Sequence, residues 1–245
     1  MKAFRTLLKT EGKLSLRGMD MFIFAICMPV VAVIIVGAIF EDKPAFDGAA
    51  YTFLEQSFGA LATIAICAGG VMGLPLVISD YRSRRILKRF KVTPTPPALI
   101  LAVQVVIYAI YSIASVILVY LTAALFFGHQ FHGSWLSFAG AYSLVMLSMF
   151  SIGLLVGGLA PSMKTASAIA SLLYFPMLIF SGATLPYEIL PAALQKAADL
   201  LPLTQGIKML KAASLGMPMV ILPVVVMTVI AVLCMSLSLR FFKWE

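Results

Sequence analysis

Histidines and cysteines are the residues of this sequence whose types could most directly do chemistry. His129 and His132 stand in the segment GHQFHGSW, and such an H-x-x-H pair could hold one face of a metal ion, but no third ligand lies nearby. We therefore interpret both as residues of a short interfacial loop. Cys27, Cys67 and Cys234 all fall inside apolar runs and form no CxxC pair, so we interpret them as small core residues. This pattern predicts no metal site and implies no oxidising compartment.

Motifs for nucleotide binding and hydrolysis are absent from the sequence. Gly12-Lys13 is followed by Leu14 and lacks the earlier glycine of a phosphate-binding loop, and no G-x-S-x-G elbow occurs. The long apolar runs contain no Asp, Glu, Lys or Arg, which argues against an ion-coupled carrier that works alone and against an intramembrane hydrolase. We predict no catalytic residue and no cofactor on this chain. The energy for any transport is expected to come from another subunit.

Positive charge is concentrated in the segment DYRSRRILKRFKVTPTP at 80–96, which contains six basic residues. Ile86, Leu87 and Phe90 lie at helical spacing among them, which predicts a short amphipathic helix from about Arg82 to Val92. The prolines that follow would end this helix, because the residue before a proline disfavours helical geometry. Such a helix could lie on lipid headgroups or insert into a groove of a soluble partner, and the sequence pattern alone allows both.

The chain around this segment is strongly apolar. Its 245 residues have a mean hydropathy of +1.04 and only 11% are charged, whereas soluble domains carry about 25% charged residues. This composition predicts a bilayer location, and the uneven placement of the net charge of +8 argues against nucleic acid as a partner. A spanning helix needs about 20 apolar residues. Six runs qualify, near 21–40, 57–79, 98–127, 135–160, 166–184 and 218–239.

The basic residues predict the orientation of these six spans. With a cytoplasmic N-terminus, fourteen of the 18 Lys and Arg residues lie inside, and only Lys43, Lys196, Lys208 and Lys211 lie outside. We therefore expect a multi-pass membrane protein with both termini in the cytoplasm. The 80–96 segment then faces the cytoplasm, where anionic lipid favours its charge.

Residues 1–20 are predicted to form an amphipathic helix that lies on the membrane and contacts lipid. Basic residues recur in this stretch at steps of three or four and form one stripe. They are Lys2, Arg5, Lys9, Lys13 and Arg17. Glu11 falls in the middle of the opposite, apolar side. We consider two explanations for it: a frayed or tilted helix, or a salt bridge from Glu11 to a basic residue elsewhere at the cytoplasmic surface.

A second polar stretch, residues 185–217, separates the fifth span from the sixth. It is too polar to cross the membrane, yet its apolar residues repeat at helical spacing. Pro191 and Pro202 lie within this stretch, and each could stand in the first turn of a helix, where proline is favoured. We predict two short helices that dip into the outer interface as interfacial or re-entrant segments. The alternative is that they only float there.

Small residues and prolines mark where the spans can touch or bend. Gly69 and Gly73 have GxxxG spacing, as do Gly153 and Gly157, which predicts close helix packing either within one bundle or along a dimer seam. Pro29, Pro75 and Pro176 fall inside the spans and are expected to kink them.

Together these features resemble the permease subunits of type-2 ABC exporters, over nearly the whole chain. The first cytoplasmic loop has the pattern R-x-x-x-x-L-K-R-x-x-x-T-P, here from Arg82 to Pro94, and a basic helix leads into a first span with a proline. The segment FPMLIFSGATLPYEILPAALQKAADLLPLTQGIKML is similar to the family's order of a proline in the fifth span, Ser-Gly, P-x-x-x-LP and LPLT. The residues that carry this order are Pro176, Ser181, Gly182, Pro186, Leu190, Pro191, Leu201 and Pro202.

The resemblance implies a fold, partners and site residues. It implies a single all-α integral membrane domain over residues 1–245, with six spans, the N-terminal interfacial helix, a coupling helix in the 80–97 loop, and outer helices at 185–217 that line or cap the exit as a gate. Two such chains, identical or related, would dock on two ATPase subunits that bind ATP and Mg²⁺. Many members carry an acidic residue beside a glycine in the coupling loop, whereas Asp80 stands alone here. The residues that would contact the ATPase are Arg82, Arg84, Arg85, Leu87, Lys88, Arg89 and Phe90.

The resemblance favours ATP-driven export of a small amphipathic substrate, such as a drug, a peptide antibiotic or a lipid-like molecule. The short outer loops fit such a substrate, and a polysaccharide or lipid-linked glycan is the alternative. A different class of function also stays open, in which the chain is a membrane-embedded assembly or immunity protein that binds a toxin or lipid without transport. An ATPase encoded next to it would discriminate between the two classes.

Overall fold

The computed structural model describes most of the chain. The described residues are 2–40, 43–46, 48–49, 51–86, 97–184, 187 and 190–242, and at Lys2, Asp20 and Pro97 the description covers the backbone alone. Within these ranges every regular element is a helix, apart from one isolated bridge between Pro44 and Thr52.

Six helical segments in the described ranges are long and apolar enough to cross a membrane, which confirms the predicted all-helical membrane fold. Each follows from an uncharged apolar run of membrane length, because a helix satisfies its own backbone hydrogen bonds in lipid. No boundary differs from its prediction by more than four residues. The spans are Ile23–Phe40, Phe53–Ser83, Ala98–Phe127, Trp135–Leu159, Met163–Phe180 and Ile221–Phe241.

The first two spans each contain more than one helical segment. The short helix α2 (Asp20–Phe22) leads into the first span, which consists of η1 (Ile23–Cys27) and α3 (Met28–Phe40). The second span consists of α4 (Phe53–Cys67), η2 (Ala68–Gly73) and α5 (Leu74–Ser83). The other spans are the single helices α7 (Pro97–Phe127), α8 (Trp135–Leu159), α9 (Met163–Phe180) and α12 (Ile221–Phe241). The remaining helices are α1 (Lys2–Gly18), α10 (Ala192–Ala198) and α11 (Pro202–Leu215).

The segments η1 and η2 are π-helical turns, and each stands just before a proline. In η1 the N–H of Met28 donates to the carbonyl of Ile23, five residues earlier, and η2 closes in the same way. Pro29 and Pro75 have no N–H, and their rings would clash with the carbonyl four residues earlier, which the wider turn relieves. The disturbance at these two prolines therefore takes the form of a π turn. Pro176 lies inside α9, which continues through it as one helix.

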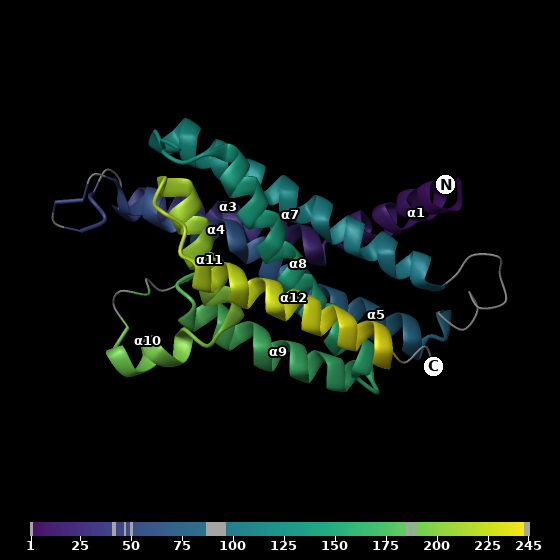
Figure 1. Ribbon diagram of the computed structural model, residues 1–245. Helices are drawn as coiled ribbons and strands as arrows, with labels where there is room; N and C mark the ends of the chain where they lie inside the picture. Colours follow the sequence, from purple (N-terminus) through teal and green to yellow (C-terminus); the bar gives the residue numbers. More distant parts are fainter. Residues whose placement is uncertain are drawn as a thin grey trace.

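The spans run side by side as one elongated bundle (Figure 1). One end of the bundle carries α1, the last turn of α5 and the C-terminal end of α12, and we call it the termini end. The opposite end carries α10, α11 and the beginning of α4. An even number of spans requires this arrangement, with both chain termini at the same end.

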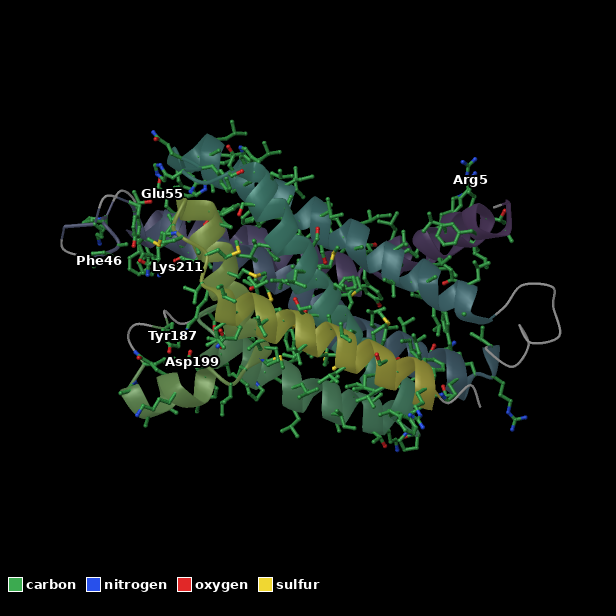
Figure 2. All side chains as sticks on the ribbon, viewed as in Figure 1. Arg5, Phe46, Glu55, Tyr187, Asp199 and Lys211 are labelled. Atoms are coloured by element: carbon green, nitrogen blue, oxygen red, sulfur yellow. The ribbon has the colours of Figure 1, made fainter. Side chains whose placement is uncertain are left out.

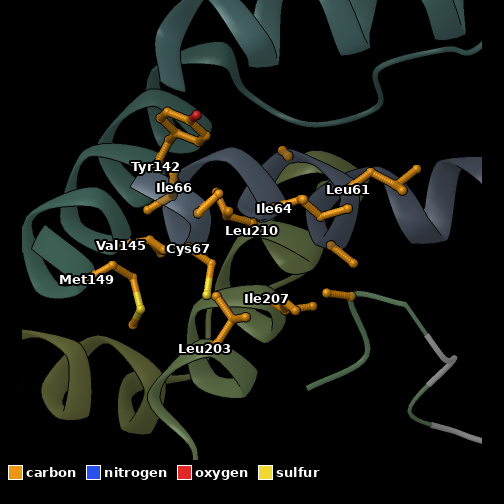
Figure 3. Packing of buried hydrophobic residues seen from close by; sticks show 14 of the residues in the cluster. Leu61, Ile64, Ile66, Cys67, Tyr142, Val145, Met149, Leu203, Ile207 and Leu210 are labelled. Atoms are coloured by element: carbon orange, nitrogen blue, oxygen red, sulfur yellow. The ribbon is translucent and has the colours of Figure 1, made fainter. Parts of the chain in front are cut away.

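The second span lies at the centre of the bundle. In its most apolar stretch 83% of the residues are buried, against 22% in the first and sixth spans. Figure 3 shows Ile64, Ile66 and Cys67 of this span packed among side chains of α8 and α11, including Met149 and Leu210. Because lipid tails are as apolar as the protein core, the outer spans can present apolar side chains to lipid while their neighbours enclose the second span.

The helix α11 belongs to this core. Its buried residues include Leu203 and Leu210, and a Cβ added to Gly59 of α4 would lie 2.8 Å from the backbone of α11. The helix α11 is therefore packed against α4 and α8, and the dip of the outer helices into the outer interface stays a prediction. The helix α10 exposes most of its residues. Pro191 precedes α10 and Pro202 opens α11, in the positions that suit proline.

The four GxxxG glycines all lie in contacts within the chain. A Cβ on Gly153 would lie 1.8 Å from the carbonyl oxygen of Gly70 in η2, and a Cβ on Gly157 would lie 3.0 Å from the Pro75 backbone. Gly69 and Gly73 lie against the ring of Tyr108 in α7. Of the two predicted uses, packing within one bundle is the one that the described structure displays.

Candidate functional site

Three polar side chains from three helices meet at the termini end. The Gln104 amide of α7 donates to Oε2 of Glu11 in α1 and to the Tyr81 hydroxyl of α5, both at 2.9 Å. The Tyr81 hydroxyl in turn donates to the same Glu11 oxygen. We call these three residues the polar cluster. It connects α1, the end of the second span and the third span through hydrogen bonds.

The apolar side of α1 brings Glu11 to these partners. Phe4, Leu7 and Leu8 pack against buried residues of the first, second and third spans, and Glu11 continues the same side one turn later. A carboxylate in this position needs hydrogen-bond donors because it is withdrawn from bulk water. Within the described ranges its partners are neutral. Within the described ranges, hydrogen bonds from the other two members of the polar cluster stand where one of the two explanations considered for Glu11 placed a salt bridge.

The basic stripe of α1 lies on its other side. Arg5, Lys9, Lys13 and Arg17 are all exposed, and Arg5 points away from the bundle in Figure 2. Lys2 is part of α1, but its side chain lies outside the described part of the chain. The division of α1 into a basic and an apolar side is as the sequence predicts, and its contact with lipid stays a prediction.

Arg82 of the predicted coupling segment points into the bundle. Its Nη1 donates to the carbonyl of Ala160, and its Nη2 donates to the carbonyls of Gly157 at 2.6 Å and Gly158 at 3.0 Å. These carbonyls end α8, where the last backbone acceptors have no partner in their own helix and where a cation is favoured by the helix dipole. The guanidinium also lies 5.9 Å from the ring centroid of Phe242. Arg82 therefore joins the end of the second span to the end of the fourth.

The helix predicted from Arg82 to Val92 needs a correction at its start. The span helix α5 continues through Ser83, and the chain then turns at Arg85, whose φ of 55° lies in the left-handed region. Because this turn uses no glycine, the sequence gives no signal for it. Arg84 lies 2.9 Å from Asp80, so Asp80 has a partner on the exposed surface. The other predicted coupling residues lie outside the described ranges; they are Leu87, Lys88, Arg89 and Phe90.

Two adjoining cavities lie beside the polar cluster. The polar cavity, of about 290 Å³, is lined by α1, η2, α5 and α7 and includes Glu11 and Tyr108. The apolar cavity, of about 350 Å³, lies deeper in the bundle between the first, second and fifth spans, and its lining, which includes Phe175, is almost wholly apolar. The residues that line both cavities are Met21, Gly73 and Leu76.

At the opposite end, a smaller cavity of about 140 Å³ is lined in part by Ser181, Gly182 and Tyr187. The Tyr187 hydroxyl donates to Oδ1 of Asp199 at 2.9 Å, and Lys208 lies 2.5 Å from the same oxygen. Tyr187 and Asp199 stand next to α10 in Figure 2. Burial alone would raise the pKa of Asp199, but the hydrogen bonds from Lys208 and Tyr187 hold this pKa below its usual range.

The predicted gate residues occupy several different positions. Of those that the structure describes, Ser181 and Gly182 line this smaller cavity. The others lie along α9 and at the beginnings of α10 and α11; they are Pro176, Leu190, Pro191, Leu201 and Pro202. Pro186 lies outside the described ranges.

The two histidines have different environments at the opposite end. His132 Nε2 lies 3.2 Å from Oε1 of Glu55, which also forms a capping box with Thr52 at the start of α4. His129 is buried, with its ring centroid 4.8 Å from that of Phe58. Burial lowers the pKa of His129 to about 4, although the nearby Glu55 carboxylate acts in the other direction. In the part of the chain that is described, no three potential metal ligands come together.

Tyr81, Gln104 and Glu55 were not among the predicted site residues. The signal for Gln104 was its place inside an uncharged span, because a buried amide needs a hydrogen-bond partner. Its position on α7 indicates neither that partner nor the helix that supplies it. Tyr81 and Glu55 lie near the two ends of the second span, where polar residues are common, so their sequence positions carry no comparable signal.

Six spans with polar contacts gathered at their ends define the class of this chain as a multi-pass membrane protein. The chain belongs to the ABC-2 type transporter family, whose model matches residues 2–215. This match covers every described helix from α1 to α11 and leaves only the sixth span outside. It confirms the family resemblance. Members of the family are the membrane components of transporters, and membership implies an ABC ATPase partner.

Curated relatives match parts of the chain. Nodulation protein J of Neorhizobium galegae is 35% identical over 100 residues, which cover 41% of this chain and 37% of that protein. Nodulation protein J of Rhizobium leguminosarum bv. viciae is 36% identical over 87 residues, 34% of each chain. The provisionally named transport permease YvfS of Bacillus subtilis (strain 168) is 22% identical over 150 residues, 58% of each chain. The chain thus spans about a third of the length of the two nodulation proteins and 58% of the permease.

Proposed function

We propose that this chain is the membrane subunit of an ATP-driven ABC exporter that moves an amphipathic substrate, such as a drug, a peptide antibiotic or a lipid-like molecule, out of a bacterial cytoplasm. Two identical or related chains form the membrane part, and two ATPase subunits bind ATP and Mg²⁺. The observation that carries this proposal is the family match over residues 2–215, together with the basic segment that follows the second span.

The termini end is proposed to face the cytoplasm. It carries the exposed basic residues Arg5, Lys9, Lys13, Arg17 and Arg84, and membrane proteins keep their excess of Lys and Arg on the cytoplasmic side. In this orientation the polar cluster lies near the inner headgroups. The pair formed by Asp199 and Lys208 then lies at the outer surface.

The contacts of α5 support a route from the ATPase to the spans. The 80–97 loop begins in the last turn of α5, so a force on this loop acts first on that turn. There Arg82 holds the end of α8, and Tyr81 holds Glu11 of α1. A displacement of α5 therefore moves α8 and α1 with it. Because the second span is buried in the bundle, its movement also reaches the remaining spans.

The apolar cavity supports an amphipathic substrate over a polysaccharide. Phe24, Met28, Phe175 and Leu178 contribute apolar side chains to its lining. A glycan needs many hydrogen-bonding groups along its path, whereas an alkyl chain or aromatic group is stabilised by an apolar wall.

Purification of the tagged chain from its native membrane in mild detergent tests the proposed function. We expect an ATPase subunit in roughly equimolar amount and ATP hydrolysis that vanadate inhibits. A chain that purifies alone would contradict the exporter and favour a binding or immunity protein.

The coupling loop can be tested within the same complex. Replacing Leu87 and Phe90 with Asp should abolish transport and ATPase association without unfolding the spans, because it removes the apolar side of the loop. Phe46→Asp at the opposite end, where Phe46 is exposed, is the matched control and should keep both. Wild-type transport by the double variant would contradict the coupling assignment.

A further inference from the structure

The polar cavity lies nearer the termini end than the apolar cavity, as the headgroup of an amphiphile lies nearer the membrane surface than its alkyl chain. Tyr81 of the polar cavity stands in the last turn of α5, whereas Met72 and Ala68 of the apolar cavity lie farther along the same span. At about 1.5 Å per helical residue they lie about 14 and 20 Å deeper. Half of the hydrocarbon core measures about 15 Å. The polar cavity therefore begins at headgroup depth beside Tyr81, and the apolar cavity extends from the shared residues Gly73 and Leu76 to the depth of the acyl chains.

The lining of the polar cavity favours a positive headgroup. Glu11 is the one charged residue among the described residues that line it. Both hydrogen bonds that Glu11 accepts fall on Oε2, so Oε1 has no bonded partner in the described part of the chain. The rings of Tyr81 and Tyr108 add aromatic surface, which attracts cations. An anionic headgroup would meet repulsion from the carboxylate instead.

The two cavities adjoin along three shared residues, Met21, Gly73 and Leu76. The Tyr108 ring packs directly against Gly73, because a Cβ there would lie 2.8 Å from the ring. Met21 and Leu76 complete the wall between the cavities, and each is only partly buried. Such side chains can change rotamer at low cost, because they are not enclosed by the core.

We propose that the two cavities together bind an amphiphile with one amine headgroup and one alkyl chain. The ammonium group donates to Oε1 of Glu11 and lies near the tyrosine rings, and the alkyl chain enters the apolar cavity between the first and fifth spans. This inference rests on the proposed function, because it names the substrate class that the exporter would take from the inner leaflet.

Binding to the purified full chain in phosphatidylcholine nanodiscs tests the headgroup. Decylammonium, decanol and decanoate share one chain length and differ in charge, and equilibrium dialysis against empty nanodiscs isolates the saturable part of their binding. We expect decylammonium to bind tightest. Glu11→Gln should weaken decylammonium binding about tenfold, the value of a lost charged hydrogen bond, and leave decanol unchanged. Asp199→Asn, the same charge change at the opposite end, should have no effect.

A second variant tests the alkyl chain independently. Leu76→Trp fills the shared wall and should weaken decylammonium and decanol binding alike. Leu172→Trp on the lipid-facing side of α9, where Leu172 is 74% exposed, is the matched control and should bind both as the wild type does. Equal binding of all three probes, or a Glu11→Gln variant with wild-type preference, would overturn the proposal. A Leu76→Trp variant that loses self-association but keeps binding would also overturn the proposal, since Leu76 would then lie in an interface between protomers.

The same assay tests which molecule supplies the amine. Together with copurification of an ATPase, it also separates the amine site from the proposed exporter function. Phosphatidylethanolamine that competes with decylammonium identifies a membrane lipid as the ligand, and its failure to compete identifies a soluble amphiphile; the amine site stands in both arms. A chain that copurifies with an ATPase but shows no amine preference overturns this site and leaves the exporter in place. If the chain binds the amine but does not copurify with an ATPase from its native membrane, the exporter is overturned and the amine site is kept.

Discussion

Among the glycines of the spanning helices, Gly153 of α8 is the one where an added methyl group would lie closest to another helix. In Gly153→Ala the new Cβ would lie 1.8 Å from the carbonyl oxygen of Gly70, whereas ordinary contacts of a Cβ begin at 3.4 Å. The obstacle is backbone, so no change of rotamer can relieve it. The helix α8 and the second span would have to move apart, and every contact between them would lengthen.

The expected cost follows from two opposing effects. Overpacking a core costs about 1–3 kcal/mol, and we place this site at about 3 because backbone must move. Alanine also favours a helix over glycine by about 1 kcal/mol. The net loss in the free energy of unfolding is therefore about 2 kcal/mol.

Gly140→Ala provides the matched control, because it makes the same substitution on the same helix. A Cβ at Gly140 would meet nothing within 4 Å, so only the helix preference remains and stability should stay equal or rise. Both variants are to be compared with the wild type by unfolding in detergent micelles, followed by circular dichroism. Equal midpoints for the Gly153→Ala and Gly140→Ala variants would refute the close contact between α8 and η2.

Three further predictions concern the ends of the bundle. Arg82→Met should lower the free energy of unfolding by about 2 kcal/mol, because it removes charged hydrogen bonds to the end of α8 that water replaces only in part. A denaturation series checks it, and wild-type stability would contradict the capping role. Tyr81→Phe should loosen α1 and speed tryptic cleavage after Lys9 and Lys13 in nanodiscs, since it removes one of three side-chain hydrogen bonds that, among the described residues, join α1 to the second and third spans; unchanged cleavage would argue against the polar cluster as the anchor of α1. His129 has a pKa of about 4 when folded and an ordinary value of 6.5, so the unfolded chain binds more protons between these pH values. Stability should be full above pH 6.5 and should fall by at most about 3 kcal/mol as the pH drops to 4; His129→Leu should remove this slope, and an identical slope in the variant would contradict it.

The spans could be predicted closely because a single physical requirement sets them. An uncharged run such as 98–127 has the length that the hydrocarbon core demands, and the third span begins and ends at these residues. The prolines signalled a disturbance at Pro29 and Pro75, but the π turn that resolves it depends on how the neighbouring backbone relaxes. The left-handed turn at Arg85 follows from the tertiary fold, since its own residue type does not favour it.

The site was predictable only in part, because the hydrophobic pattern of one helix does not indicate which residues of other helices it contacts. The stripe pattern showed that Glu11 faces inward, but its partners come from residues 70 and 93 positions away in the sequence. Arg82 illustrates the same point. The family resemblance assigns it to the coupling segment, and the structure adds that its guanidinium binds carbonyls at least 75 positions away. The charge of a loop therefore does not determine the direction of each of its side chains.

The two π turns place the same kind of defect at neighbouring positions of two spans. A π turn holds one surplus residue in a helix, and such turns are places where a helix can bend. Because η1 and η2 contact each other, a bend at one turn acts directly on the other. The segment η2 lies between α4 and α5, so a bend there would reorient the turn that bears Tyr81 and Arg82 while α4 stays packed against α11.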